Sequence, residues 1–395
     1  MALALIDPYW EDWLELGFRW LHVIAGIVWI GTSFYFVALD NHLGRPRVEE
    51  EGVGGESWEI HGGGFYRISK YRVAPRELPE PLHWFKWEAY TTWLSGFGLL
   101  VVLYYANAET YLIDKSVADI PVAAAVGASL IGLAAAWVVY DLACMAVKSD
   151  LVIGLLLLTM TIGSAYAAGQ IFSGRAAYLQ VGAMLGTIMA ANVLFNIIPA
   201  HWELIRAKEA GRDPDAAPGL EAKRRSVHNN YLTLPVVFTM ISNHFAFTYE
   251  HEHAWLVLVA LTLIGAWIRH FFNLRHAGRT DWLIPVTAVA ASVLLAVAIR
   301  PDDGGGGAPA APVDDERAVA IVQQRCVPCH AQNPTQEGYD APPAGVVLET
   351  REQITDQAAA VEEQAVRTEA MPLGNVTGMT EDERETLGAW LDSLE

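Results

Sequence analysis

Cys326 and Cys329 are separated by two residues and followed directly by His330, in the run Cys-Val-Pro-Cys-His. Two thiols at this spacing reach the two vinyl groups of one porphyrin, and the histidine then lies under the iron, so the run is typical of covalent c-type haem attachment. The iron takes a second axial ligand, and Met371, in a Met-Pro pair, is the predicted one. Met379 is the rival, but it precedes the helix-start pattern Thr-Glu-Asp-Glu, where a methionine side chain is expected to pack.

A redox dithiol or half of a zinc site is the alternative for the two cysteines. A structural zinc site takes about four ligands. The remaining cysteine, Cys144, lies in an apolar run, so no second cysteine pair exists. The adjoining histidine therefore favours haem.

The composition divides the 395 residues into two parts. Apolar residues make up 53% of the chain, and up to about residue 300 they gather into segments of the roughly 20 residues that a helix needs to cross a lipid bilayer. A Gly/Pro-rich stretch follows, and the remainder is polar and acidic, which argues against nucleic acid as a partner. We expect an integral membrane domain at 1–300, a flexible linker at 301–313 and a soluble domain at 314–395.

The expected fold class is all-α, a polytopic membrane helical bundle followed by a small class I cytochrome c domain. In the small domain, a helix before the cysteines and a closing helix near 381–394 should enclose the porphyrin. About eight transmembrane helices are predicted in the bundle. They are residues 16–38, 90–106, 120–147, 150–168, 178–200, 232–249, 254–272 and 282–299.

Lys and Arg concentrate in alternate loops, beginning with residues 39–89 and ending with a group that includes Arg269. The opposite loops keep only Lys115, Arg175 and Arg300. Because positively charged loops stay in the cytoplasm, both termini are expected outside. Covalent haem attachment belongs to that same oxidising side. The predicted location is the inner membrane of a bacterium, with a periplasmic cytochrome domain and a first span that itself directs insertion.

Ionisable side chains inside a span are costly to bury, so they are candidates for function. Arg19 and His22 share one face of the first span, and His244 falls at a similar depth in the sixth. Two level histidines predict a b-type haem in the membrane domain, with His22 and His244 as its iron ligands. A simple packing role for each histidine, or an anion clamp with Arg19, stays open.

Lys86, Trp87 and Glu88 precede the second span on the cytoplasmic side. Together with Arg19 they are the candidate catalytic residues, since they offer a cation, an aromatic wall and a carboxylate that can accept protons. Tryptophan and charged residues at a membrane interface are commonly anchors, so a structural role is the alternative.

The segments 18–31 (FRWLHVIAGIVWIG), 82–90 (LHWFKWEAY) and 370–375 (AMPLGN) resemble the membrane-bound urate oxidases, or urate hydroxylases, that carry a fused cytochrome c domain. The likeness extends from the first span to the carboxyl terminus. It implies oxidation of urate to 5-hydroxyisourate with water as the oxygen source and without hydrogen peroxide. The electrons would pass to the fused c-type haem and on to a soluble cytochrome c and a terminal oxidase. The first span is also similar to membrane proteins that hold a b-type haem, which favours His22 as an iron ligand.

The alternative function is a membrane cytochrome subunit that transfers electrons from quinol or a dehydrogenase to cytochrome c. Such a subunit needs little cytoplasmic loop, whereas residues 39–89 form a long one rich in Gly, Trp and His. The sequence leaves open which residues touch urate, from which side urate enters and whether the protein forms oligomers.

Overall fold

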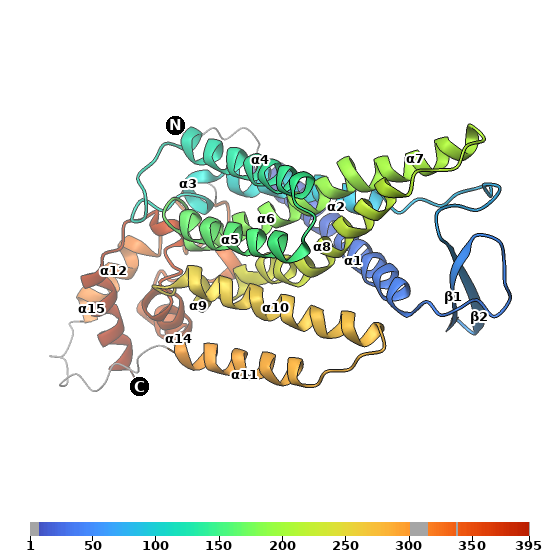
Figure 1. The fold of residues 1–395 in the computed structure, drawn as a ribbon. Helices are drawn as coiled ribbons and strands as arrows, with labels where there is room; N and C mark the ends of the chain where they lie inside the picture. Colours follow the sequence, from blue (N-terminus) through green and yellow to red (C-terminus); the bar gives the residue numbers. More distant parts are fainter. Residues whose placement is uncertain (1–7, 301–314, 337–338, 395) are drawn as a thin grey trace.

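The computed structural model describes residues 8–300, 315–336 and 339–394. The described chain is mostly helical. Figure 1 shows a bundle of long helices with a small helical domain at one end and a β-hairpin at the other. The linker predicted at 301–313 lies outside the described residues.

The bundle is built from long helices joined by short ones. The long helices are α1 (Pro8–His42), α2 (Trp87–Leu99), α4 (Val122–Ala146), α5 (Asp150–Gly169), α6 (Gly174–Asn192), α8 (Ala216–Ile241), α10 (Ala254–His276) and α11 (Leu283–Ala298). The short ones are α3 (Ala108–Tyr111), α7 (Ile198–Glu209) and α9 (Ala246–Tyr249), with π-helical turns at Leu100–Tyr105 after α2 and Val193–Ile197 after α6.

Five helices in the described part of the chain are long and apolar enough to cross a membrane. They are Tyr9–His42, Val122–Ala146, Asp150–Gly169, Gly174–Glu209 and Ala254–His276, which agree with the first, third, fourth, fifth and seventh predicted spans. The other three predicted spans fall on α2, α8 and α11, which are shorter or less apolar. The count of eight therefore stays a prediction.

The core of the bundle is centred on α6, most of which is buried. Leu185 and Ile188 of α6 belong to one apolar cluster with Ile153 of α5 and Leu258 of α10. The outer faces carry large exposed apolar side chains, such as Leu151, which is 74% exposed. An apolar exterior of this kind suits contact with lipid.

Residues 39–89 are not simply a loop, because they contain an antiparallel hairpin of β1 (Val53–His61) and β2 (Gly64–Tyr71). His61 pairs with Gly64, so Gly62 and Gly63 form a two-residue turn, with φ values of 56° and 82°. Positive φ at both positions is what the favoured hairpin turn requires. The all-α prediction missed this hairpin, although the Gly-Gly pair between two aromatic-rich runs is a recognisable signal for it.

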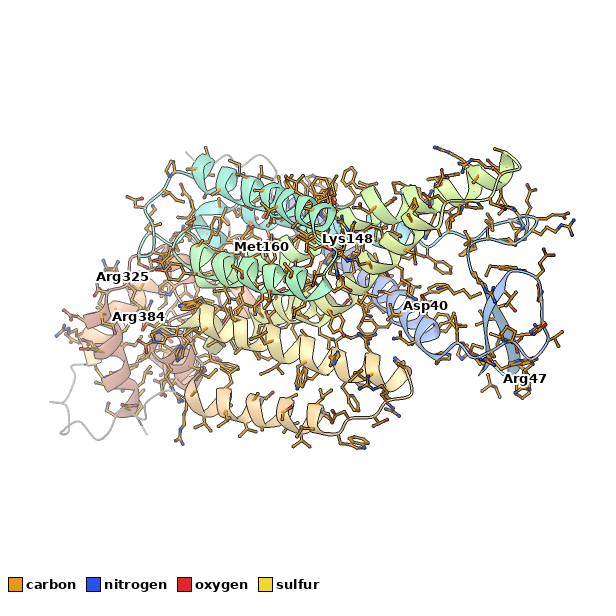
Figure 2. The ribbon with its side chains drawn as sticks, viewed as in Figure 1. Asp40, Arg47, Lys148, Met160, Arg325 and Arg384 are labelled. Atoms are coloured by element: carbon orange, nitrogen blue, oxygen red, sulfur yellow. The ribbon has the colours of Figure 1, made fainter. Side chains whose placement is uncertain are left out.

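Different parts of the chain contact the two ends of the bundle. Asp40 of α1 lies toward the hairpin end (Figure 2). It pairs with Lys70 of β2 and, at 3.1 Å, with Lys223 of α8. At the other end, the C-terminal domain touches the short helix α3, where a Cβ on Gly374 would lie 2.8 Å from the carbonyl oxygen of Thr110. The basic loop and the cysteine-bearing domain are thus at opposite ends, as the predicted orientation requires.

The C-terminal domain comprises α12 (Asp315–Arg325), α13 (Arg351–Asp356), α14 (Ala358–Val361), a π-helical turn Glu362–Arg367 and α15 (Glu381–Asp392). Leu387 and Trp390 of α15 are fully buried against α12 and α13. The predicted capping box is present, because Thr380 and Glu383 each bond the other's backbone at the start of α15. Arg325 pairs with Glu383 at 3.0 Å and so joins α12 to α15.

The close approach of α6 and α8 depends on Gly182, because a Cβ there would overlap the Thr239 hydroxyl and lie 2.7 Å from Thr239 Cβ. We expect Gly182→Ala to destabilise the protein by about 1–3 kcal/mol through overpacking. Gly186, in the same helix, has nothing within 4 Å of its Cβ position. Gly186→Ala is the matched control and should be neutral or slightly stabilising. Thermal unfolding in detergent measures both, and equal shifts would contradict this account.

Candidate functional site

The two cysteines and the histidine form a tight turn directly after α12. The Cys326 amide donates to the Val322 carbonyl at 2.8 Å, and the His330 amide donates to the Cys326 carbonyl at 2.9 Å. Both thiols are unpaired, with Cys326 buried and Cys329 partly accessible. Burial raises the pKa of Cys326 to about 12 and also raises the pKa of Cys329. Redox dithiols have lowered thiol pKa values, so the local environment disfavours that alternative.

His330 is held in one ring orientation by the backbone. Its Nδ1 lies 3.0 Å from the Val346 carbonyl oxygen, so Nδ1 carries the proton and Nε2 has a lone pair available for a metal. A carbonyl on the far ring nitrogen is the usual support of a ligating histidine. Among the described residues no three His, Cys, Asp or Glu side chains cluster as a metal site, and a haem that takes one histidine and one methionine needs no such cluster.

Met371 and Met379 occupy different environments in the same domain. Met371 is partly buried and packs against the apolar cluster that contains Cys326. Its carbonyl accepts a hydrogen bond from Arg384 at 2.8 Å, and its amide donates to the Gln364 carbonyl at 2.8 Å. Met379 is 4% exposed and is itself part of the core. Two unpaired thiols, an oriented imidazole and the Met371 thioether therefore fit a c-type haem.

The two histidines predicted to hold a second haem differ in burial and in local structure. His22 of α1 is partly buried against α2, with Nδ1 2.8 Å from the Thr92 carbonyl oxygen and 3.3 Å from Ser95 Oγ. His244 is exposed in a short turn, Ser242–His244, because α8 ends at Ile241 and does not continue to residue 249. The Ser242 hydroxyl bonds the Thr239 carbonyl there, a local bond that competes with helix continuation.

Lys86 is surrounded by tryptophan rings. Its ammonium nitrogen lies 4.8 Å from the ring centroid of Trp84, 5.8 Å from that of Trp202 and 6.0 Å from that of Trp87. Such cation–π contacts hold the charge close to the start of α2. Glu88, two residues on, has a buried Oε2 without a hydrogen-bond partner among the described residues. The structure thus leaves one carboxylate oxygen available to a ligand or water.

Arg19 does not belong to this group. The antiparallel contact of His22 with Ser95 sets the register of α1 against α2, and it places Glu88 level with the middle of α1. At 1.5 Å of rise per residue, Arg19 then lies roughly 15 Å from Glu88 along the bundle axis. Arg19 pairs instead with Glu15, one helical turn earlier, on the exposed face of α1.

A buried polar network that the sequence analysis missed joins α4, α6 and α8. Arg225 of α8 is 1% exposed and donates to Asp141 of α4 at 2.8 Å and to Asn192 of α6 at 3.0 Å. Asn192 donates in turn to Tyr140 at 3.1 Å and Asn229 at 2.9 Å. Spacing along the sequence gives no signal for this network, because its members come from three different helices.

A second missed cluster lies between α8 and α10. Asn230 Oδ1 accepts hydrogen bonds from Arg269 Nε and Asn273 Nδ2, each at 2.9 Å. Arg269 was counted as a cytoplasmic loop charge, although it falls inside the predicted span 254–272. The rule that singled out Arg19, a charge within an apolar segment, applies equally to Arg269.

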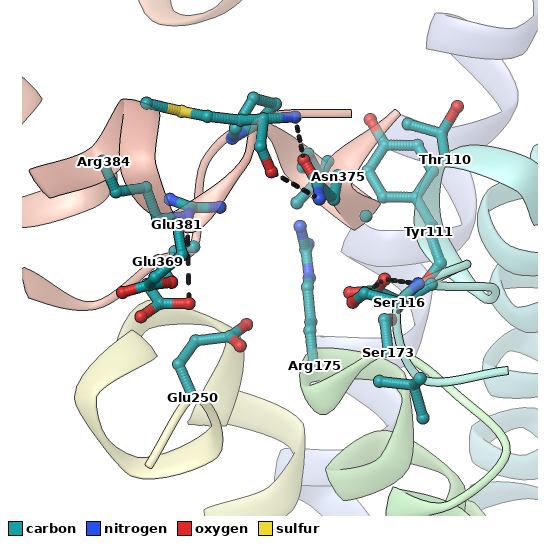
Figure 3. A pocket seen from close by; sticks show the side chains of 17 residues that line it. Thr110, Tyr111, Ser116, Ser173, Arg175, Glu250, Glu369, Asn375, Glu381 and Arg384 are labelled. Carbon is teal, nitrogen blue, oxygen red and sulfur yellow. Dashed lines mark hydrogen bonds and ion pairs between the residues drawn. The ribbon is translucent and has the colours of Figure 1, made fainter. Parts of the chain in front are cut away.

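A cavity of about 320 Å³ lies between the bundle and the C-terminal domain (Figure 3). Its lining carries four carboxylates against two guanidinium groups. They are Asp114, Glu250, Glu369 and Glu381, and Arg175 and Arg384. Partial desolvation of Glu250 at the wall of the cavity, with Asp114 and Glu369 nearby, raises its pKa to about 8, although much of its surface stays exposed to water. The negative balance disfavours this cavity as a site for an anion.

An apolar helical bundle with polar clusters in its interior is the architecture of polytopic membrane proteins, and here it carries a small helical domain at one end. Residues 8–300 match the family described as urate oxidase N-terminal, so the chain belongs to this family of oxidoreductases. No curated protein and no solved structure matches the chain.

The raised pKa of Glu250 predicts that the stability of the folded protein, through the contact between its two domains, depends on pH. Because the folded-state pKa of Glu250 is raised to about 8 from an ordinary value near 4.5, folding retains a proton that the unfolded chain has lost. Stability should therefore fall as pH rises from about 5 to 8 and then level off with respect to this group. Glu250→Gln should remove this part of the dependence, whereas Glu252→Gln, at a position that does not line the cavity, should not. Melting temperatures of the purified protein between pH 5 and 9 measure it, and identical profiles for the two variants would refute it.

Proposed function

We propose that this protein is a membrane-bound urate oxidase that converts urate to 5-hydroxyisourate and passes the electrons to a c-type haem in its own C-terminal domain. The family match over residues 8–300 supports the substrate, and it is the observation that carries the proposal. The Cys-Val-Pro-Cys-His turn in a separately cored domain supports the acceptor. A soluble cytochrome c and a terminal oxidase would then receive the electrons, with no hydrogen peroxide formed.

The C-terminal domain fits the haem through four side chains. Cys326 and Cys329 would form the thioether links, and His330 and Met371 would supply the two axial ligands. The bound group supplies an iron that takes up and releases one electron at a time. The protein's own part is to orient these ligands, by the Val346 carbonyl on His330 and by Arg384 on the Met371 backbone.

The reaction adds one water to urate and releases two protons and two electrons. A group near the reacting carbon must accept protons as water adds. Glu88 is the best candidate base, since its buried Oε2 has no protein partner among the described residues. Lys86 would contribute positive charge and Trp87 an aromatic wall, whereas Arg19 lies too far along the bundle to share a substrate with Glu88.

Glu88 lies in the first turn of α2, level with the middle of α1, whereas the haem turn lies beyond the far end of the bundle, so electrons would have to cross a large part of a hydrocarbon layer that is roughly 30 Å thick. An intramembrane b-type haem would shorten this distance. His22 fits as a ligand, because the Thr92 carbonyl holds Nδ1 and leaves Nε2 available. His244 stays the proposed partner. A pyridine haemochrome spectrum of the purified protein that contains only c-type haem would rule out this second cofactor.

Urate added without oxygen to the oxidised protein should reduce the c-type haem, and turnover in air with cytochrome c as the acceptor should form no hydrogen peroxide. Reduction by quinol and not by urate would favour the membrane cytochrome subunit instead.

Met371→Ala should leave the haem covalently attached, because both cysteines remain, but should block electron transfer from urate to external cytochrome c. Met379→Leu is the matched control and should transfer electrons at the wild-type rate, since Met379 packs in the core. The c-haem absorbance and the rate of cytochrome c reduction are the two measurements. Full activity of Met371→Ala would overturn the ligand assignment.

Glu88→Gln should lower kcat by about 10²- to 10⁴-fold, the usual contribution of a general base, while KM changes little. Glu77→Gln, in the same loop, should retain wild-type kcat. A Glu88→Gln enzyme with unchanged kcat would remove Glu88 from the mechanism.

A further inference from the structure

The bundle contains two deeply buried arginines with very different partners. Arg225 of α8 is 1% exposed and forms ion pairs with Asp141 at 2.8 Å and Glu221 at 3.1 Å. Arg269 of α10 is 3% exposed, yet no carboxylate among the described residues lies within 4.0 Å of it. The Nη2 atom of Arg269 also has no hydrogen-bond partner among the residues that the structure describes.

A buried cation without a counter-ion opposes folding, and the cost is greatest at the depth of the hydrocarbon. The guanidinium carbon of Arg269 lies 3.6 Å from the ring centroid of Phe34, on α1. This contact holds the guanidinium group flat and compensates part of its desolvation, but it supplies no negative charge. The arrangement therefore lacks an anion.

The atoms around Arg269 form a set of unused donors and acceptors. Asn230 is completely buried. Neither its Nδ2 nor the Oδ1 of Asn273 has a hydrogen-bond partner among the described residues. The two amides are oriented by their own bonds, because Asn230 Oδ1 accepts from Arg269 and from Asn273. The free atoms are thus two donors, Arg269 Nη2 and Asn230 Nδ2, and one acceptor, Asn273 Oδ1.

We propose that Arg269, Asn230 and Asn273 bind the urate anion, an inference that rests on the proposed function. Urate is planar and offers carbonyl oxygens to the two donors and ring N–H groups to the acceptor. Its negative charge would neutralise Arg269, and the fork of the guanidinium group suits recognition of a planar anion.

The depth of this site agrees with the position of the candidate base. Arg269 contacts Phe34, whereas the register of α1 against α2 places Glu88 level with about residue 29 or 30 of α1. The difference along the bundle axis is about 7 Å at 1.5 Å of rise per residue. Arg275 in the last turn of α10 adds positive charge at the hairpin end. Urate would therefore enter from that end and not from the acidic cavity beside the C-terminal domain.

The test compares Arg269→Gln with Arg225→Gln in the full-length, haem-loaded protein. Arg269→Gln should raise the Kd and KM for urate by roughly 10- to 100-fold, the effect of a lost charge-assisted hydrogen bond. It should also raise the melting temperature without urate, since it removes an uncompensated charge. Arg225→Gln should lower that temperature, because it leaves Asp141 and Glu221 unpaired, and the protein that remains folded should keep the wild-type KM. Arg269→Lys, which keeps the charge but not the fork, should fall between wild type and Arg269→Gln.

The outcomes separate this inference from the proposed function. If the wild-type protein binds and oxidises urate while Arg269→Gln keeps the wild-type Kd and KM, the site assignment is wrong and the proposed function stands. If Arg269→Gln loses stability as Arg225→Gln does, Arg269 is a structural residue. A wild-type protein that neither binds nor oxidises urate would refute both proposals.

Discussion

The ion pairs of Arg225 are the interaction on which the interior of the bundle depends. A single guanidinium group on α8 satisfies Asp141 of α4 and Asn192 of α6, so three helices are joined by polar contacts where water is excluded. Each of these groups would be costly to bury alone. The network also sets the rotation of α8. With Arg225 turned toward α4 and α6, Asn230 is turned toward α10, and the second polar cluster follows from the first.

The molecule separates its two chemical regions along the bundle axis. The half of the bundle nearer the hairpin carries Lys86, Glu88 and the cluster around Arg269, whereas the opposite end carries the Cys-Val-Pro-Cys-His turn. Opposite ends suit an oxidation in which substrate and electron acceptor are on different sides of a membrane. The same separation requires a route for electrons through the bundle, and it makes the polar groups along α1 and α2 relevant to function.

The parts of the structure that depend on local sequence could be predicted. The capping box at Thr380 needs only two side chains three residues apart. The long apolar helices need only a run of apolar residues, and five of the predicted spans have that length and composition. Prediction was less successful where a structural feature depends on several residues that are not adjacent in the sequence. The end of α8 at Ile241 depends on side chain to backbone bonds, and the hairpin depends on the pairing of two runs across Gly62 and Gly63.

The sequence by itself predicted covalent haem attachment at residues 326–330, because this attachment depends on two thiols and a histidine at a fixed spacing. It also determined which segments are apolar enough to be buried in lipid. Only the tertiary structure decided which buried charges are compensated. Neither Arg225 nor Arg269 reveals its partners through its place in the sequence. Arg225 meets carboxylates from another helix and from its own preceding turn, whereas Arg269 meets a phenyl ring and the Asn230 amide. Partners that come from helices far apart in the chain cannot be read from spacing, since they depend on how the helices are rotated and packed.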